Sequence, residues 1–109
     1  MISSDIIRGY NDTIILYMLK QRDSYGYEIS KRIAEQTNGN YIIKETTLYS
    51  TFARLQKNGY ISSYSGTKTN GRTRTYYKIT SEGLRYYWEK CKEWKLTKDV
   101  INIFTEEET

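Results

Sequence analysis

Apolar residues recur at helical spacing in four stretches of the chain, and two short runs are rich in strand-forming residues. The first helix is predicted over residues 4–21. Ser4 is its candidate N-cap, and Gly9 is a weak point because glycine costs about 1 kcal/mol relative to alanine inside a helix. Its apolar line consists of Ile7, Tyr10, Ile14 and Met18, with Ile15 and Leu19 beside them.

Two further helices follow at short separation. The second is predicted over residues 24–37, with Tyr25, Ile29 and Ile33 in line, and Asn38-Gly39-Asn40 is a strong stop signal. Residues 41–43 form a brief apolar run that suits either a short edge strand or an extended connector. The third helix is predicted over residues 45–58. Leu48, Phe52 and Leu55 are its buried stripe, and Gly59 is its left-handed C-terminal residue.

A hairpin and a last helix complete the pattern. Residues 60–64 and 74–79 are rich in strand formers, and the loop between them contains the turn dipeptide Asn70-Gly71. The last helix opens with Thr80 or Ser81 as N-cap and is predicted to run through Phe104, about 30 Å at 1.5 Å per residue. Its apolar positions are Leu84, Tyr87, Cys91 and Trp94, continued by Leu96, Val100, Ile103, Ile101 and Phe104.

The order helix, hairpin, helix is the layout of a winged helix. We therefore expect an α+β, mostly helical fold: a winged helix-turn-helix with a long C-terminal dimerisation helix. Residues 1–80 are the expected DNA-binding domain, residues 81–105 the dimerisation helix, and residues 106–109 a disordered acidic tail. The last helix is too long for the core of one chain, and exposed apolar length of this kind usually pairs, here in a homodimer.

Positive charge is concentrated in the second half of the predicted winged helix. Residues 41–80 carry seven basic residues and one acid, Glu45, so this segment has a net charge of +6 against +4 for the whole chain. Localised basicity is typical of phosphate binding, although a solvated basic surface would show it too. Together with the helix–wing order, it favours double-stranded DNA as a partner.

Composition excludes several other classes of function. The chain has no histidine and one cysteine, Cys91, so neither a zinc site nor a Cys–His catalytic pair is expected, and no cofactor is indicated. A lone cysteine on an apolar helix face is usually a packing residue. Neither a membrane span nor a signal peptide is indicated, and cysteine usage fits a cytoplasmic location. An enzyme is not expected.

Candidate DNA contacts lie on the outer face of the third helix and on the wing. Small hydroxyl side chains near a helix N-terminus can reach base edges, although Thr46 and Thr47 would also suit a simple capping role. The cationic wing tip can lie over a phosphate ridge, or it can be a solvated hairpin tip. The predicted contacts are Lys44, Thr46, Thr47, Tyr49, Ser50, Arg54, Lys68, Arg72 and Arg74.

Four sequence pieces in this order resemble the PadR-type transcriptional regulators. They are Tyr25-Gly26-Tyr27-Glu28-Ile29, Thr47-Leu48-Tyr49, the segment RLQKNGYI at 54–61 and the segment RTYYKITSEG at 74–83. The similarity covers roughly residues 5–104. It implies a homodimeric repressor with residues 45–58 as recognition helix, residues 60–79 as wing, and dimerisation through residues 81–104 with help from the first helix.

The resemblance also points to a ligand. The chain is similar to the short subgroup, some members of which bind flat hydrophobic drugs between two tryptophans, one from each subunit. Trp94 falls at the matching distance and Trp88 is an extra aromatic; both are candidate ligand-binding residues. A tryptophan on a dimerisation helix is also a common core residue. Two departures from the family pattern, Thr73 and Ser50, change one wing position and one groove-facing position.

The function expected from these observations is sequence-specific regulation by a dimer on an inverted-repeat operator. Repression is the expected outcome, released by a small planar hydrophobic ligand. The alternative is a winged-helix protein-interaction module without specific DNA binding. Such a module would more often show an apolar patch on the outer face of the third helix.

Overall fold

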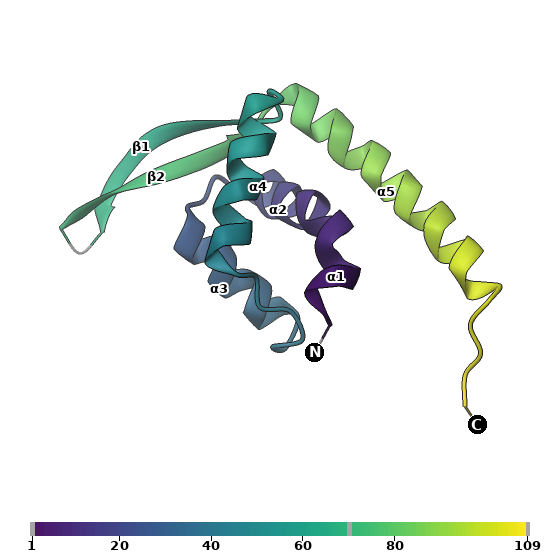
Figure 1. Cartoon of the computed structure of the whole chain (residues 1–109). Coiled ribbons are helices and arrows are strands. Elements are labelled where there is room, and N and C mark those ends of the chain that lie inside the picture. Colours follow the sequence, from purple (N-terminus) through teal and green to yellow (C-terminus); the bar gives the residue numbers. More distant parts are fainter. Residues whose placement is uncertain (1, 70, 109) are drawn as a thin grey trace.

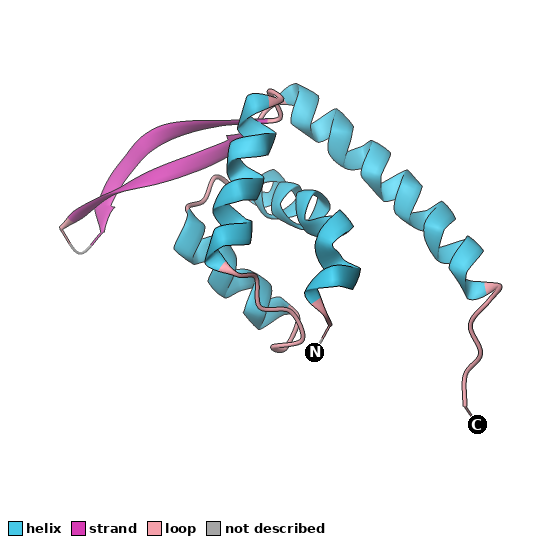
Figure 2. Cartoon of the chain, in the orientation of Figure 1, coloured by secondary structure: helices cyan, strands magenta, loops and turns pink. Residues whose placement is uncertain are grey.

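The computed structural model describes residues 2–69 and 71–108, with residues 67–69 through their backbone alone. A central group of helices carries two long projections, a β-hairpin and a C-terminal helix, which leave it in different directions (Figure 1). The elements in chain order are α1 (Ser4–Ile7), the 3-10 helix η1 (Arg8–Tyr10), α2 (Asn11–Gln21), α3 (Gly26–Gln36), α4 (Glu45–Lys57), β1 (Ile61–Thr69), β2 (Arg72–Ile79) and α5 (Ser81–Asn102) (Figure 2). The expected mostly helical α+β fold with a hairpin wing and a long C-terminal helix is confirmed.

The first helix is interrupted, which corrects the prediction of one helix over residues 4–21. Gly9 lies within the 3-10 turn η1, where the α-helical hydrogen bonding of α1 gives way before α2 begins. Glycine lowers helical stability, so the break falls near the weak point that the sequence marks. Ser3 rather than Ser4 is the N-cap, its hydroxyl accepting a 3.4 Å hydrogen bond from the amide of Ile6.

Helices α3 and α4 form the helix-turn-helix unit. α3 begins two residues later than predicted, because Ser24 is drawn into a backbone bridge with the wing, and it ends one residue earlier, at Gln36. Asn38 and Gly39 have positive φ angles of 51° and 77°, which end the helix as the stop signal predicts. Residues 41–43 are an extended connector, not a strand.

The core lies where α2, α3 and α4 meet and is closed by the base of the wing and the first turns of α5. The predicted stripe of α4 is buried, as Leu48, Phe52 and Leu55 are each no more than 2% exposed. The ring of Phe52 stacks on Tyr77 of β2 at 4.0 Å between centroids. On α2 the buried line is turned toward Leu16, which the predicted line omits, so Tyr10 and Ile14 are only partly covered.

The wing is a two-stranded antiparallel hairpin whose strands are longer than predicted. β1 and β2 pair from Ile61 opposite Ile79 out to Thr69 opposite Arg72, with an irregularity between Ser65 and Lys68. The loop expected over residues 65–73 is therefore mostly strand. Asn70 of the predicted turn lies outside the described residues, while Gly71 has a positive φ of 78°.

Helix α5 begins at a built cap and then leaves the core. The hydroxyl of Thr80 accepts from the amide of Gly83 at 3.0 Å and donates to the carbonyl of Gly59 at 2.7 Å, which confirms the predicted N-cap. Tyr87 is buried, whereas Val100 and Ile101 are about half exposed. The helix ends at Asn102, two residues before the predicted end at Phe104. Among the described residues, no helix is long and apolar enough to cross a membrane.

Candidate nucleic-acid interface

The outer face of α4 is polar and exposed. Thr46, Tyr49 and Ser50 are exposed on the first two turns, and Lys57 extends the same face at the end of the helix. The N-cap of α4 is Lys44, which makes no side-chain capping bond. Thr46 and Thr47 therefore do not have the N-capping role, and Thr46 is free to serve another.

Thr47 is turned away from this face. It is half-buried and lines a groove of about 500 Å³ between the N-terminal segment and the start of α4, together with Lys44 and Arg8. Its carbonyl accepts hydrogen bonds from the hydroxyls of Ser50 and Thr51, at 3.1 and 2.7 Å. The structure thus separates Thr47 from Thr46, Tyr49 and Ser50, although all four lie on consecutive turns.

Arg54 is committed to an intramolecular ion pair with Asp12 of α2. Its two terminal nitrogens donate to the two carboxylate oxygens at 2.7 and 2.6 Å. Hydrogen bonding to this carboxylate raises the pKa of Arg54. The hydroxyl of Tyr86 on α5 donates to the same carboxylate at 3.2 Å. Asp12 therefore joins α2, α4 and α5, and most of the charge of Arg54 is matched within the chain.

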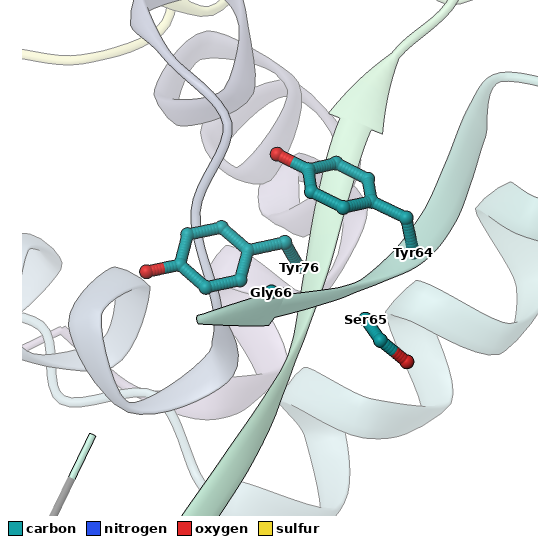
Figure 3. A pocket seen from close by; sticks show the side chains of 4 residues that line it. All are labelled: Tyr64, Ser65, Gly66 and Tyr76. Carbon is teal, nitrogen blue, oxygen red and sulfur yellow. The ribbon is translucent and has the colours of Figure 1, made fainter. Parts of the chain in front are cut away.

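The wing carries the remaining predicted cations. Arg72 is exposed near the tip, and Arg74 is partly covered at mid-strand. The side chain of Lys68 lies outside the described part of the structure. Tyr64 and Tyr76 stack at 5.8 Å between centroids on one side of the hairpin, over Gly66, while Ser65 points to the other side (Figure 3). A Cβ at residue 66 would lie 2.0 Å from the ring of Tyr76, so any other residue there would displace this ring.

The base of the wing is fastened to the segment before α3. Ser24 and Tyr77 exchange two backbone hydrogen bonds, of 3.2 and 2.8 Å. The hydroxyl of Tyr64 donates to Asp23 at 2.6 Å, an interaction that raises the pKa of Tyr64. These contacts fix the direction in which the cationic strand leaves the helical part.

The two tryptophans lie in different surroundings on α5. Trp94 packs edge-to-face on Tyr10 at 5.2 Å and lines a mostly apolar groove of about 620 Å³ between the N-terminal helices and the second half of α5. Trp88 is not part of that groove. It contacts Tyr87, and the Lys20 ammonium lies 5.4 Å from its ring centre.

Sequence reasoning missed three residues of this surface. Ala53 is exposed on the same stripe as Thr46 and Ser50, and the helical period could have marked it. Tyr25 and Tyr27 reach the wing from the start of α3. Nothing local in the sequence signals that contact, since it depends on how the wing docks.

Comparison with known proteins decides the family. The sequence profile of the transcriptional regulator PadR-like family matches residues 15–89. The chain belongs to this family. It is thus a DNA-binding transcriptional regulator rather than an enzyme, and the matched range runs from α2 through the wing into the first turns of α5.

Proteins similar to this chain over most of its length include two of known structure. A transcriptional regulator from Clostridium thermocellum, Cth-833, is 64% identical, with a TM-score of 0.90 over 97% of this chain and 100% of that one. A PadR family transcription regulator from Clostridium difficile R20291 is 35% identical, with a TM-score of 0.75 over 87% and 97% of the two chains. A relative from Lysinibacillus sphaericus is 48% identical over 106 residues, 97% of each chain.

A more distant structure includes DNA. Bacillus subtilis PadR, solved in complex with operator DNA, aligns with a TM-score of 0.66 over 73% of this chain and 46% of that one. At 19% identity, this likeness concerns the fold.

Proposed function

We propose that this PadR-like protein is a homodimeric repressor that binds an inverted-repeat operator. The observation that carries the proposal is the division of the surface. The exposed polar face of α4 and the cationic wing lie at one part of the fold, and an apolar face that the described residues leave about half exposed runs along α5. Residues 1–80 would read DNA, and residues 81–105 would pair two copies.

The recognition helix is α4, and the wing is β1 with β2. Thr46, Tyr49 and Ser50 are the proposed base-reading or backbone contacts, because they are exposed within the first two turns. Lys44, Lys68, Arg72 and Arg74 are the proposed phosphate contacts. Thr47 and Arg54 keep a lesser place: Thr47 is half-buried, and the guanidinium of Arg54 is bound to Asp12.

Dimerisation is proposed through α5 and the N-terminal helices. Trp94, Val100 and Ile101 are each about half exposed in the single chain, and Ile6 is 70% exposed. Apolar surface of this extent on a projecting helix is typical of a homodimer interface. A twofold dimer places its recognition helices about one DNA turn apart or a multiple of it, which predicts an inverted repeat.

A planar hydrophobic ligand is proposed to bind near Trp94 and to release DNA. Support comes from the half-exposed indole of Trp94 at the edge of the apolar groove. An indole face also attracts a cation, by about 0.5–2 kcal/mol depending on desolvation. Trp88 keeps a lesser place in this proposal: it is half exposed but lies outside the groove, next to Tyr87 and the Lys20 ammonium. The coupling between ligand and DNA must be reciprocal in affinity.

The deciding experiment selects bound fragments from random duplex DNA and measures their salt dependence. A dimeric repressor should enrich an inverted repeat, and Arg72→Gln should make the slope of log affinity against log salt shallower by about one unit. Ser50→Ala should instead change the enriched sequence. Absence of any enriched sequence would favour a protein-interaction module.

Titration with flat cationic dyes tests the proposed ligand site. The tryptophan fluorescence of the wild-type protein should be quenched saturably. Trp88→Phe should retain this saturable quenching, and Trp94→Phe should lose it.

A further inference from the structure

A small polar cavity connects the recognition helix with the wing. It has a volume of about 240 Å³ and lies between the start of α3, the first half of α4 and the middle of β2. Among the described residues that line it, none is acidic. The lining residues that matter here are Tyr25, Gly26, Tyr27, Tyr49 and Arg74. The cavity thus combines one permanent positive charge with several neutral hydroxyl groups.

Arg74 is held in place by aromatic rings rather than by a carboxylate. Its guanidinium carbon lies 5.2 Å from the ring centre of Tyr25, and Tyr25 packs against Tyr76 at 5.3 Å. The Nε atom of Arg74 is buried and has no hydrogen-bond partner among the described residues. A cation that is already oriented by stacking loses little conformational freedom when it binds an anion.

The carboxylates close to this site in sequence are bound elsewhere. Asp23 accepts from the hydroxyl of Tyr64 at 2.6 Å. Glu28 accepts from the hydroxyl of Ser24, and Arg22 lies 3.7 Å from the same oxygen. Among the described residues, neither carboxylate forms an ion pair with Arg74, whereas Arg54 is bound by both oxygens of Asp12.

The position of Tyr49 depends on residue 26 being a glycine. A Cβ at Gly26 would lie 2.4 Å from the Tyr49 hydroxyl oxygen, so glycine is needed for the phenol to reach the start of α3. The ring of Tyr49 also packs edge-on against Phe52 at 5.7 Å. Tyr27, at 64% exposure, lies at the open side of the cavity.

We propose that this cavity binds one phosphodiester of the DNA backbone in each half-site. Arg74 supplies the charge, and the hydroxyls of Tyr27 and Tyr49 donate to the phosphate oxygens. One cation and neutral donors suit a singly charged phosphodiester. Because residues of α3, α4 and β2 would bind the same phosphate, the contact sets the angle of the wing relative to the recognition helix on the duplex. The inference rests on the proposed DNA binding and assigns a role to the start of α3.

The test replaces single backbone phosphates of a selected duplex by neutral methylphosphonates. Several positions should be sensitive in the wild-type protein, and at the one per half-site that Arg74 contacts the loss in affinity should be about ten- to a hundredfold, the value for a hydrogen bond to a charged group. In Arg74→Gln that position should become nearly insensitive. Arg72→Gln is the matched control: it removes the same charge from the same strand and should retain the sensitivity. Tyr27→Phe should reduce it by about two- to tenfold.

The outcomes separate this inference from the proposed function. If wild-type protein binds DNA but Arg74→Gln keeps the full sensitivity at every position, the phosphate site is wrong and DNA binding stands. If wild-type protein selects no DNA, the proposed function fails as well. Saturable binding of inorganic phosphate at the cavity, without any position sensitive to Arg74, would assign it to a free anion and overturn the proposal. Circular dichroism checks that each variant is folded. If Arg74→Gln does not fold, Arg74→Lys takes its place, because lysine keeps the charge but loses the planar fork of the guanidinium. This variant should show partial sensitivity at the Arg74 position, and full wild-type sensitivity there would overturn the proposal.

Discussion

Removing Arg54 should destabilise the protein more than neutralising its partner Asp12. The Asp12 side chain is 12% exposed and that of Arg54 is 52% exposed. Arg54→Met leaves a nearly buried carboxylate whose one remaining partner among the described residues is the Tyr86 hydroxyl at 3.2 Å. Losing one partner of a buried pair costs about 3–5 kcal/mol, and the lower end, about 3 kcal/mol, applies because Tyr86 remains.

Asp12→Asn has a smaller effect because Arg54 is half in water. The guanidinium can be rehydrated, and the asparagine oxygen still accepts one of its hydrogen bonds. A loss of about 1 kcal/mol is expected, as for an ordinary hydrogen bond. The predicted difference between the two substitutions is therefore about 2 kcal/mol, with methionine and asparagine chosen to keep side-chain volume.

Urea unfolding followed by far-ultraviolet circular dichroism measures both values. Protein concentration must be constant, because subunit association contributes to apparent stability. Glu35→Gln is the control: its pair with Lys31 is 4.0 Å long and both side chains are more than 60% exposed, so the change should be at most a few tenths of a kcal/mol. Equal losses for Arg54→Met and Asp12→Asn, or a larger loss for Asp12→Asn, would refute the reasoning from burial.

Three further predictions concern glycine, tyrosine and the helix cap. Gly83→Ala should destabilise by about 1–3 kcal/mol in thermal unfolding, because its Cβ would lie 2.0 Å from a backbone oxygen, whereas Gly9→Ala meets no atom within 4 Å and should be neutral or stabilising. Burial raises the pKa of Tyr87 to about 12 from 10.0. The native state thus holds this proton more tightly, so stability should be fully present below pH 10 and fall as pH rises toward 12, less steeply in Tyr87→Phe. Thr80→Ala should lower stability by about 1 kcal/mol, whereas Thr80→Ser should retain most of it; equal losses would contradict the capping role.

Local signals in the sequence predicted the elements well. The stripe of Leu48, Phe52 and Leu55 marks α4 because each residue repeats on the helical period and faces the core. Gly59 at a φ of 78° and Thr80 at the start of α5 are set by backbone chemistry within a few residues. These features depend on short stretches of chain and are readable there.

Features that depend on docking could not be predicted. The pairing of Arg54 with Asp12 joins residues far apart in the sequence, so a count of charges assigns that arginine to DNA without seeing its partner. The bridge between Ser24 and Tyr77, which delays the start of α3, also joins residues far apart in the sequence and has no local signal. Charge pattern alone thus overstates the number of free cations on the surface.

The wing is anchored at its base by a backbone bridge, and the exposed residues toward its tip take no part in that anchor. Ser24 is fully buried and binds Tyr77 through two main-chain hydrogen bonds. Because these bonds involve no side-chain atoms, other side chains that fit the space at these two positions would preserve them. Arg72 and Thr73, further out, are exposed and make no part of that anchor. Residues toward the tip can therefore be exchanged without disturbing the contact that anchors the wing. Libraries that vary residues 72 and 73 and leave the base and Gly71 intact should consist mostly of folded proteins.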